Sequence, residues 1–382
     1  MLESPFARPD PKLRIKQFSH LVPRPTPEQV AKFPADAKAL LDRIWTRHSE
    51  LISYGQFDLD WMRGKHFLLA GATGPGLGGA IESAARRFTV VDGSVTVIAR
   101  DLSKSVGYET GREMLERAKK AGFAERYHLL NSGMELKGPA LEAIITALHE
   151  AGAKEVIYIN GVAAAFSGML PGYPPVFVKD VDKDGLFQYE LQLLTDQQIE
   201  TTRYIMGIMA VEFPRYLQDA GIKIEATCYM DWRGSLDVIS RDPESPYYGR
   251  QGPYSTSLYL PKQFVKADTI QAYGHGRKVL DCYLPVMRTR AIGFIPGATP
   301  QAYIAEKMME LSNVRKRDVP ELALGVLDQI GRAVSGNTFN PFPRLDDHEV
   351  PLEEWYWQIV QRLTNDEDSE FYWKNWIPIE FD

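Results

Sequence analysis

The sequence has few cysteine and histidine residues and no long apolar run. Its 382 residues include two cysteines, Cys228 and Cys282, and seven histidines. Two isolated cysteines give neither a disulfide framework nor the paired spacing of a zinc site, so we expect a reducing compartment and no bound metal. No run approaches the about eighteen apolar residues of a membrane-spanning helix, and the N-terminus lacks the apolar segment of a secretion signal. These absences predict a cytoplasmic protein with no membrane partner.

An excess of positive charge is also absent. Lysine and arginine together number 44 and aspartate and glutamate 50, which gives a formal net charge of -6. Nucleic-acid binding requires a clustered basic surface that neutralises phosphates, so we expect no nucleic-acid partner. With 44% hydrophobic and 25% charged residues, the composition is that of an ordinary globular protein. Small-molecule ligands are therefore favoured.

Strand-like and helix-like segments alternate through the middle of the chain. Strands are predicted at 65–71, 95–100, 126–131, 154–161 and 222–230, with helices from about 76, at 105–121, 138–152 and 197–219. Such alternation is typical of βαβ units in a doubly wound parallel sheet. We therefore expect an α/β domain over 65–335 with long substrate-loop insertions, among them one long connection at 163–192. A helical N-terminal extension would occupy 1–64, and an aromatic tail over 336–382 would pack on the core or on a second subunit.

Glycines are concentrated where the first predicted strand gives way to a helix. The segment "FLLAGATGPGLGG" places Gly71, Gly74, Gly76 and Gly78 between an apolar run and a helical pattern. Glycine allows the backbone to approach a ligand closely, and a helix N-terminus attracts anions. Strand, glycine turn and helix in this order predict a Rossmann-type site for the pyrophosphate of a dinucleotide. The alternative is a tight turn without a ligand.

The end of the second predicted strand bears on which dinucleotide binds. Arg100 follows the apolar run "VTVIA", and Lys104 comes shortly after it. An arginine at this point accommodates a 2′-phosphate, whereas an acid binds the free ribose hydroxyl of NAD. The sequence therefore favours NADPH, although Asp101 keeps NADH open. A solvated helix start is the structural alternative.

A tyrosine and a lysine that could carry the chemistry lie further along. In "YSTSLYLPKQFVK", Tyr259 precedes Lys266, and Tyr254 with Lys262 forms a competing pair. The charge of a lysine lowers the pKa of a neighbouring phenol, which then polarises or protonates a carbonyl at neutral pH. Lys266 opens a segment that looks helical. An amphipathic helix without any catalytic role is the alternative.

Over about residues 65–335, the order of these segments resembles that of the trans-2-enoyl-CoA reductases and the related long-chain type of enoyl-acyl-carrier-protein reductase. These form a branch of the short-chain dehydrogenase/reductase superfamily. The segments "TTRYIMGIMAVEFPRYLQDAG" and "VMRTRAIGFIPGATPQAYIAEKM" are also similar to that branch. The resemblance implies that Lys266 binds the nicotinamide ribose, that Tyr259 is its paired tyrosine, and that Tyr229 is a second tyrosine near the substrate carbonyl.

The same resemblance implies further cofactor contacts. Asn160 and Gly161 would lie beside the cofactor, and Thr289 falls on the segment after the sixth strand. Asn131 stands where such reductases often have an aspartate that meets adenine. The family has eight residues between its tyrosine and lysine, whereas six separate Tyr259 from Lys266, and the preceding loop is longer here. Tyr248 and Tyr254 therefore stay open as the catalytic tyrosine.

The predicted function is that of an NAD(P)H-dependent reductase. Hydride would pass to the C=C of a 2-enoyl thioester, with assistance from the tyrosine and the lysine. A ketone reductase on the same scaffold and a non-catalytic NADPH-sensing protein are the alternatives. The expected partner is a small acyl or carbonyl substrate, and a homo-oligomer stays open.

Overall fold

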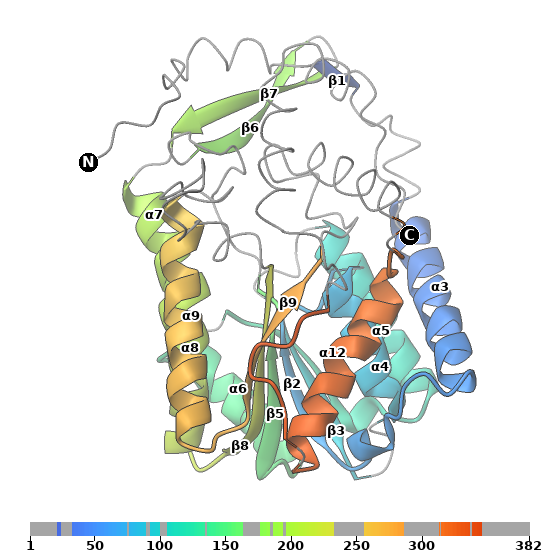
Figure 1. The fold of residues 1–382 in the computed structure, drawn as a ribbon. Coiled ribbons are helices and arrows are strands. Elements are labelled where there is room, and N and C mark those ends of the chain that lie inside the picture. The colour runs from blue at the N-terminus through green and yellow to red at the C-terminus, as the bar shows by residue number, and fades with distance from the viewer. Residues whose placement is uncertain are drawn as a thin grey trace.

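The protein folds around a central parallel sheet that is covered by helices on both faces (Figure 1). Its structure, a computed structural model, describes residues 21–23, 33–74, 76–88, 92–99, 105–133, 136–162, 176–183, 186–193, 196–232, 256–285, 313, 315–336 and 338–345.

Six strands form the central sheet, in the order β4-β3-β2-β5-β8-β9 and all parallel. The strands are short apolar runs, and β2, β3 and β9 are buried along most or all of their length. The order reverses between β2 and β5, which is the switch point of a doubly wound sheet. The predicted Rossmann-type α/β fold is confirmed. The strand bounds are β2 His66–Ala70, β3 Ser94–Ala99, β4 Tyr127–Asn131, β5 Glu155–Asn160, β8 Lys223–Trp232 and β9 Val279–Leu284.

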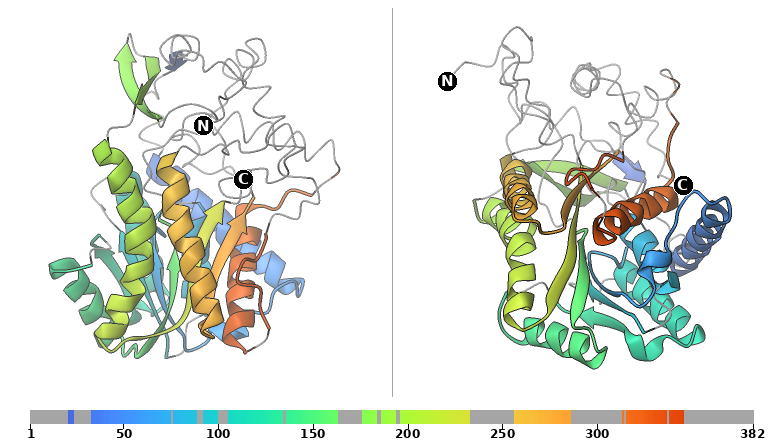
Figure 2. Two further views of the ribbon diagram at one scale, coloured as in Figure 1. Left: turned by 60° about the vertical axis from the view of Figure 1, so that its left-hand side comes forward. Right: turned by 60° about the horizontal axis from the view of Figure 1, so that its bottom comes forward.

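Two layers of helices enclose this sheet (Figures 1 and 2). One layer packs around the larger core cluster and contains α3 Phe33–Ser53, α4 Leu77–Phe88, α5 Ser105–Lys120 and α12 Val319–Val334. The other covers the opposite face and contains α6 Pro139–Glu150, α8 Met209–Asp219 and α9 Thr256–Gly274. Shorter helical segments are η1 Asp60–Met62, η2 Ala124–Arg126, α7 Asp196–Arg203 and the π-helical turn η3 Tyr204–Ile208.

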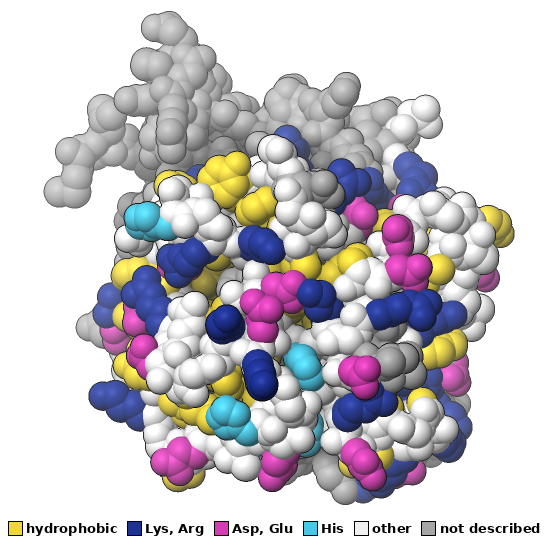
Figure 3. Space-filling model, turned by 90° about the horizontal axis from the view of Figure 1, so that it is seen from below, with side chains coloured by type: hydrophobic (Ala, Val, Ile, Leu, Met, Phe, Trp, Pro, Cys, Tyr) yellow, Lys and Arg dark blue, Asp and Glu magenta, His cyan; other side chains and the backbone are white. Residues whose placement is uncertain are grey.

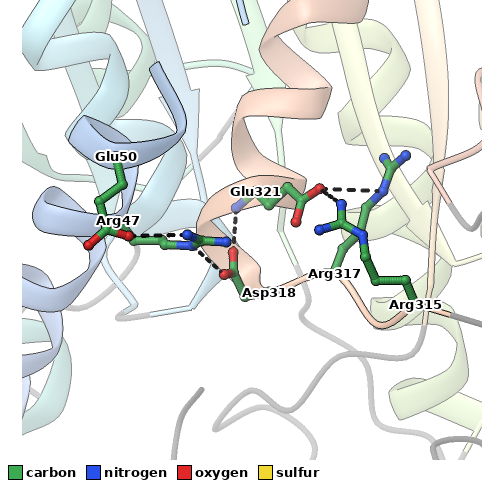
Figure 4. Close-up of polar contacts among 6 residues, drawn as sticks. All are labelled: Arg47, Glu50, Arg315, Arg317, Asp318 and Glu321. Atoms are coloured by element: carbon green, nitrogen blue, oxygen red, sulfur yellow. Dashed lines mark hydrogen bonds and ion pairs between the residues drawn. The ribbon is translucent and has the colours of Figure 1, made fainter. Parts of the chain in front are cut away.

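The predicted N-terminal helix is part of this same core. Figure 4 shows Arg47 of α3 between Glu50 and Asp318, and Arg47 Nε donates to Asp318 Oδ2 at 2.7 Å. Asp318 also caps α12, because its Oδ1 accepts a hydrogen bond from the Glu321 amide at 2.8 Å. Glu321 in turn forms ion pairs with Arg315 and Arg317. This network fastens α3 to the start of α12.

Residues after α12 extend the edge of the central sheet. The amide of Asp281 donates to the Pro341 carbonyl at 2.8 Å, and the amide of Tyr283 donates to the Pro343 carbonyl at 2.9 Å. The segment runs parallel to β9, with a bridge between Tyr283 and Arg344. The start of the predicted tail therefore covers an otherwise open edge. The rest of that tail, residues 346–382, lies outside the described residues.

A second, small sheet is formed by segments that the sequence pattern suggested were loops. Strands β6 Val176–Lys183 and β7 Leu186–Leu193 form an antiparallel hairpin, and β1 Leu21–Pro23 pairs with β7. Figure 1 shows this sheet beyond the upper end of the central strands. The alternating pattern on both sides of "DG" at 184–185 is a hairpin signal. The structure shows this hairpin and so corrects the prediction of a plain connection there.

Candidate nucleotide and catalytic site

The glycine turn after β2 packs directly against the end of β5. Gly71 has a φ of +76°, and a Cβ atom there would lie 2.6 Å from the Gly161 carbonyl oxygen and 2.8 Å from the Val162 nitrogen. Only glycine satisfies both requirements, because a side chain would be strained by φ and would overlap the neighbouring backbone. The Gly161 amide donates to the Ala70 carbonyl at 2.9 Å. The turn is therefore held close to the switch point.

The same turn leads into α4 through closely packed backbone. The Gly76 carbonyl accepts the first helical hydrogen bond, from Ala80 at 3.0 Å. A Cβ on Gly78 would overlap the Gly71 carbonyl, so the helix rests on the turn itself. By contrast, a Cβ on Gly74 would meet nothing within 4 Å. The Gly74 carbonyl lies against the first turn of α4, because a Cβ on Gly79 would overlap its oxygen. Among the described residues, the space beside Gly74 is therefore open at the start of a helix, where an anion would be favoured.

Asn160 fixes the geometry of the neighbouring strand end. Its side chain is buried, and Oδ1 accepts a hydrogen bond from the Val162 amide at 2.9 Å. In the sheet register, Asn160 lies between Ala70 of β2 and Tyr229 of β8. The structure therefore brings Asn160 and Gly161 next to Gly71, while their contact with a cofactor stays a prediction.

A buried ion pair occupies the end of β8. Asp231 is the penultimate residue of the strand, and its Oδ1 lies 2.7 Å from Nζ of Lys262 in α9. The Asp231 side chain is 1% exposed and that of Lys262 is 14% exposed. Burying two charges is costly unless they are paired, so this contact is a strong constraint on both side chains. It lies at the same edge of the sheet as the glycine turn.

Lys266, the predicted ribose lysine, lies on the same helix and is partly buried. Helix α9 connects the end of β8 to the start of β9, so it runs back toward the N-terminal edge of the sheet. Lys266 is one turn, about 5.4 Å, farther than Lys262 from the edge where ligands bind in such sheets. Tyr259 lies on the first turns of α9, but its side chain, like the whole of Tyr248 and Tyr254, is outside the described residues.

Tyr229 is enclosed between β8 and α9. It is 3% exposed, and its hydroxyl donates to Asp268 Oδ2 at 3.2 Å. Burial, together with the negative charge of Asp268, raises the pKa of Tyr229 well above its usual value. Arg215 and Arg277 also approach Asp268. These contacts join β8 to its covering helices, and a role for Tyr229 at the substrate carbonyl stays a prediction.

Other predicted residues fall at the edges of the described structure. Asn131 ends β4 and is exposed, and the amide of the following Ser132 donates to the Ala99 carbonyl at 2.8 Å. Arg100 and Thr289 are outside the described residues. Within the described ranges, no cluster of three or more His, Cys, Asp or Glu side chains could hold a metal. No helix in these ranges combines the length and apolar character needed to cross a membrane.

Asp231 is the residue that the sequence analysis missed. It follows directly on the apolar run "ATCYM", and an acid at the end of a predicted buried strand is the signal that could have identified it. Lys262 had been weighed only as an alternative to Lys266. In the structure, Asp231 and Lys262 form an ion pair at the C-terminal edge of the central sheet.

The sequence matches no protein-family model and no curated protein. The structure, however, is similar to that of trans-2-enoyl-CoA reductase from Clostridium acetobutulicum in complex with NADH. The match has a TM-score of 0.60 at 15% identity and covers 90% of this chain and 88% of the other. A structure of that enzyme in complex with NAD gives a TM-score of 0.57 at 17% identity, covering 89% and 91%. The chain therefore shares the fold of trans-2-enoyl-CoA reductase. This agrees with the resemblance that the order of its segments indicated.

Proposed function

We propose that the protein is an NAD(P)H-dependent oxidoreductase that reduces the C=C bond of a 2-enoyl thioester. The observation that carries the proposal is the meeting of two features at one edge of the sheet. The Gly71 turn ends β2, and the Asp231–Lys262 pair ends β8, on either side of the switch-point strand β5. In doubly wound sheets, dinucleotides bind at the carboxyl ends of the strands, across the switch point. The shared fold with an enoyl-CoA reductase supports the choice of substrate.

The residues of the glycine turn fit a dinucleotide. The open space at Gly74 would receive the pyrophosphate, and the amides at the start of α4 would donate to its oxygens. Asn160 and Gly161 would line the path toward the nicotinamide, as the family resemblance implies. NADPH remains the favoured form because of Arg100, with NADH as the alternative. When bound, the cofactor supplies hydride to the β-carbon of the substrate.

The chain itself would supply orientation and charge stabilisation. A lysine of α9 would bind the nicotinamide ribose, and a tyrosine near the start of α9 would stabilise the enolate oxygen. The sequence suggested Lys266 with Tyr259. The geometry favours Lys262, because its ammonium group is fixed at the end of β8, and its partner would then be Tyr254.

Fluorescence titration with NADPH and NADH, followed by addition of crotonyl-CoA and longer 2-enoyl thioesters, tests this proposal. We expect binding and then oxidation of the bound nucleotide. Binding without oxidation would favour the ketone-reductase or sensor alternatives, which a ketone substrate separates. Binding of neither nucleotide would refute the cofactor site.

Alanine substitutions distinguish the two lysines. Lys262→Ala should lower kcat/KM by about tenfold to a hundredfold, since a hydrogen bond from a charged group contributes about 1.5–3 kcal/mol. Lys266→Ala, which removes the same charge from the next turn of α9, should have a smaller effect. The reverse ranking would restore Lys266 and Tyr259 as the functional pair.

A further inference from the structure

Asp231 has surroundings that differ from those of the chain's exposed acids. Its carboxylate is 1% exposed and lies at the end of a central strand rather than on a helix surface. Its strand neighbour two residues back, Tyr229, points to the same face of the sheet, where α8 and α9 pack. Asp231 is therefore held by β8 on one side and by Lys262 of α9 on the other.

A lysine without such a partner would sample many positions. Its ammonium group sits on a long flexible stem, and ordering that stem costs conformational entropy. The contact of 2.7 Å with a buried, strand-held carboxylate fixes the ammonium group before any ligand arrives. At 14% exposure, Lys262 still keeps part of its surface open at the site edge. A preorganised cation of this kind binds a ligand hydroxyl with less ordering cost.

We propose that Asp231 is a positioning residue that holds the Lys262 ammonium group at the place where the nicotinamide ribose binds. This inference rests on the proposed function. Asp231 touches neither substrate nor cofactor and acts only through Lys262. Its removal should therefore weaken binding of the nicotinamide half of the dinucleotide and leave the adenosine half unaffected.

The same strand offers a matched control at its other end. Glu225 of β8 forms an ion pair with Lys65 at 2.5 Å, with side-chain exposures of 13% and 30%. This pair lies near the N-terminal edge of the sheet, the face seen in Figure 3, where acidic and basic side chains are interspersed. Glu225→Gln thus removes an ion-paired carboxylate of the same strand, far from the glycine turn.

The experiment compares Asp231→Asn, Lys262→Met, their double variant and Glu225→Gln by titration with two ligands. The ligands are NADPH and adenosine 2′,5′-bisphosphate, which lacks the nicotinamide half. Asp231→Asn and Lys262→Met should each raise the Kd for NADPH by about tenfold, as expected for loss of one charge-assisted hydrogen bond. The double variant should bind NADPH no more weakly than Lys262→Met alone. Adenosine 2′,5′-bisphosphate should bind equally to all, and Glu225→Gln should bind both ligands like the wild type.

Each other outcome overturns the inference. An unchanged Kd for NADPH in Asp231→Asn would show that the pair is only structural, while the proposed function stands. Equal weakening of both ligands would indicate a general loosening of the fold. A further loss of NADPH affinity in the double variant would show that Asp231 acts independently of Lys262. If Asp231→Asn does not fold, Lys262→Met decides, because an unchanged Kd for NADPH in that variant would show that the Lys262 ammonium group does not bind the nicotinamide half. A wild-type protein that binds neither ligand and does not bind NADH would refute the proposed function and this inference with it.

Discussion

Acidification should destabilise the protein through His48. This residue lies on α3 with 0% exposure, in the layer shared with α4 and α12. The pKa of His48 is lowered from 6.5 to about 4, mainly by burial and to a smaller extent by the charge of Arg87, while a hydrogen bond with the backbone of Pro320 and the charge of Asp318 oppose the change. Protonation in the folded state would place a charge inside this layer, so the folded protein resists it.

The sign and size of the effect follow from these values. Between pH 6.5 and about 4 the unfolded chain binds a proton at His48 that the folded chain does not, so the free energy of unfolding falls as the pH falls through this range. The full gap of about 2.5 pH units corresponds to about 3 kcal/mol. Between pH 7 and pH 5, the loss from His48 alone should be about 2 kcal/mol. Burial also lowers the pKa of His66 and His128, which add to the same trend.

Urea unfolding at pH 7 and pH 5 isolates the His48 contribution. The loss of unfolding free energy between these conditions should be about 2 kcal/mol smaller in His48→Gln than in the wild type. His275 is exposed, so His275→Gln serves as the control and should lose as much as the wild type. If His48→Gln loses as much stability on acidification as the wild type does, the account of His48 as a buried neutral group is wrong.

Two further sets of variants test the glycine turn and the cap of α12. Gly71→Ala should lower the free energy of unfolding by more than about 2 kcal/mol, because Gly71 has a φ of +76° and contacts Gly161. Gly74→Ala should leave the free energy of unfolding nearly unchanged but weaken NADPH binding in a titration. In urea unfolding, Asp318→Ala should lower the free energy of unfolding by about 1–2 kcal/mol. Asp318→Asn should lower it by less, because asparagine still caps α12 and loses only the ion pair with Arg47. Equal stability of Gly71→Ala and Gly74→Ala would contradict the structural role of Gly71. Equal stability of the Asp318 variants and the wild type would contradict the role of Asp318 as the cap of α12.

The sequence was sufficient to predict the central sheet, because its strands are buried apolar runs separated by helices with one apolar face. The strand at Glu155–Asn160 and the helix after Gly76 both follow from local pattern and turn chemistry. The β6–β7 hairpin was missed although its alternation and its Asp-Gly turn are visible, because the stretch was interpreted as one long connection. Helix α9 begins at Thr256, before the predicted start near Lys266, since Pro261 and the preceding serines and threonine weaken the helical pattern there.

The candidate site was predicted only where one segment contains the whole signal. The glycine turn needs no partner to be noticed. Its contact with Gly161 and the pairing of Asp231 with Lys262 are created by the fold, which brings together segments far apart in the chain. Residue spacing alone therefore could not predict these contacts.

Transfer of deuterium from the nicotinamide to the substrate tests whether the protein reduces the C=C bond of a 2-enoyl thioester. The protein would be incubated with crotonyl-CoA and NADPH carrying deuterium at C4 of the nicotinamide, on either face, and the product analysed by mass spectrometry and NMR. We expect butyryl-CoA with deuterium at the β-carbon. Crotonyl-CoA recovered unchanged with both labelled cofactors and with labelled NADH, or deuterium transferred only to the carbinol carbon of an alcohol formed from a ketone, would contradict it.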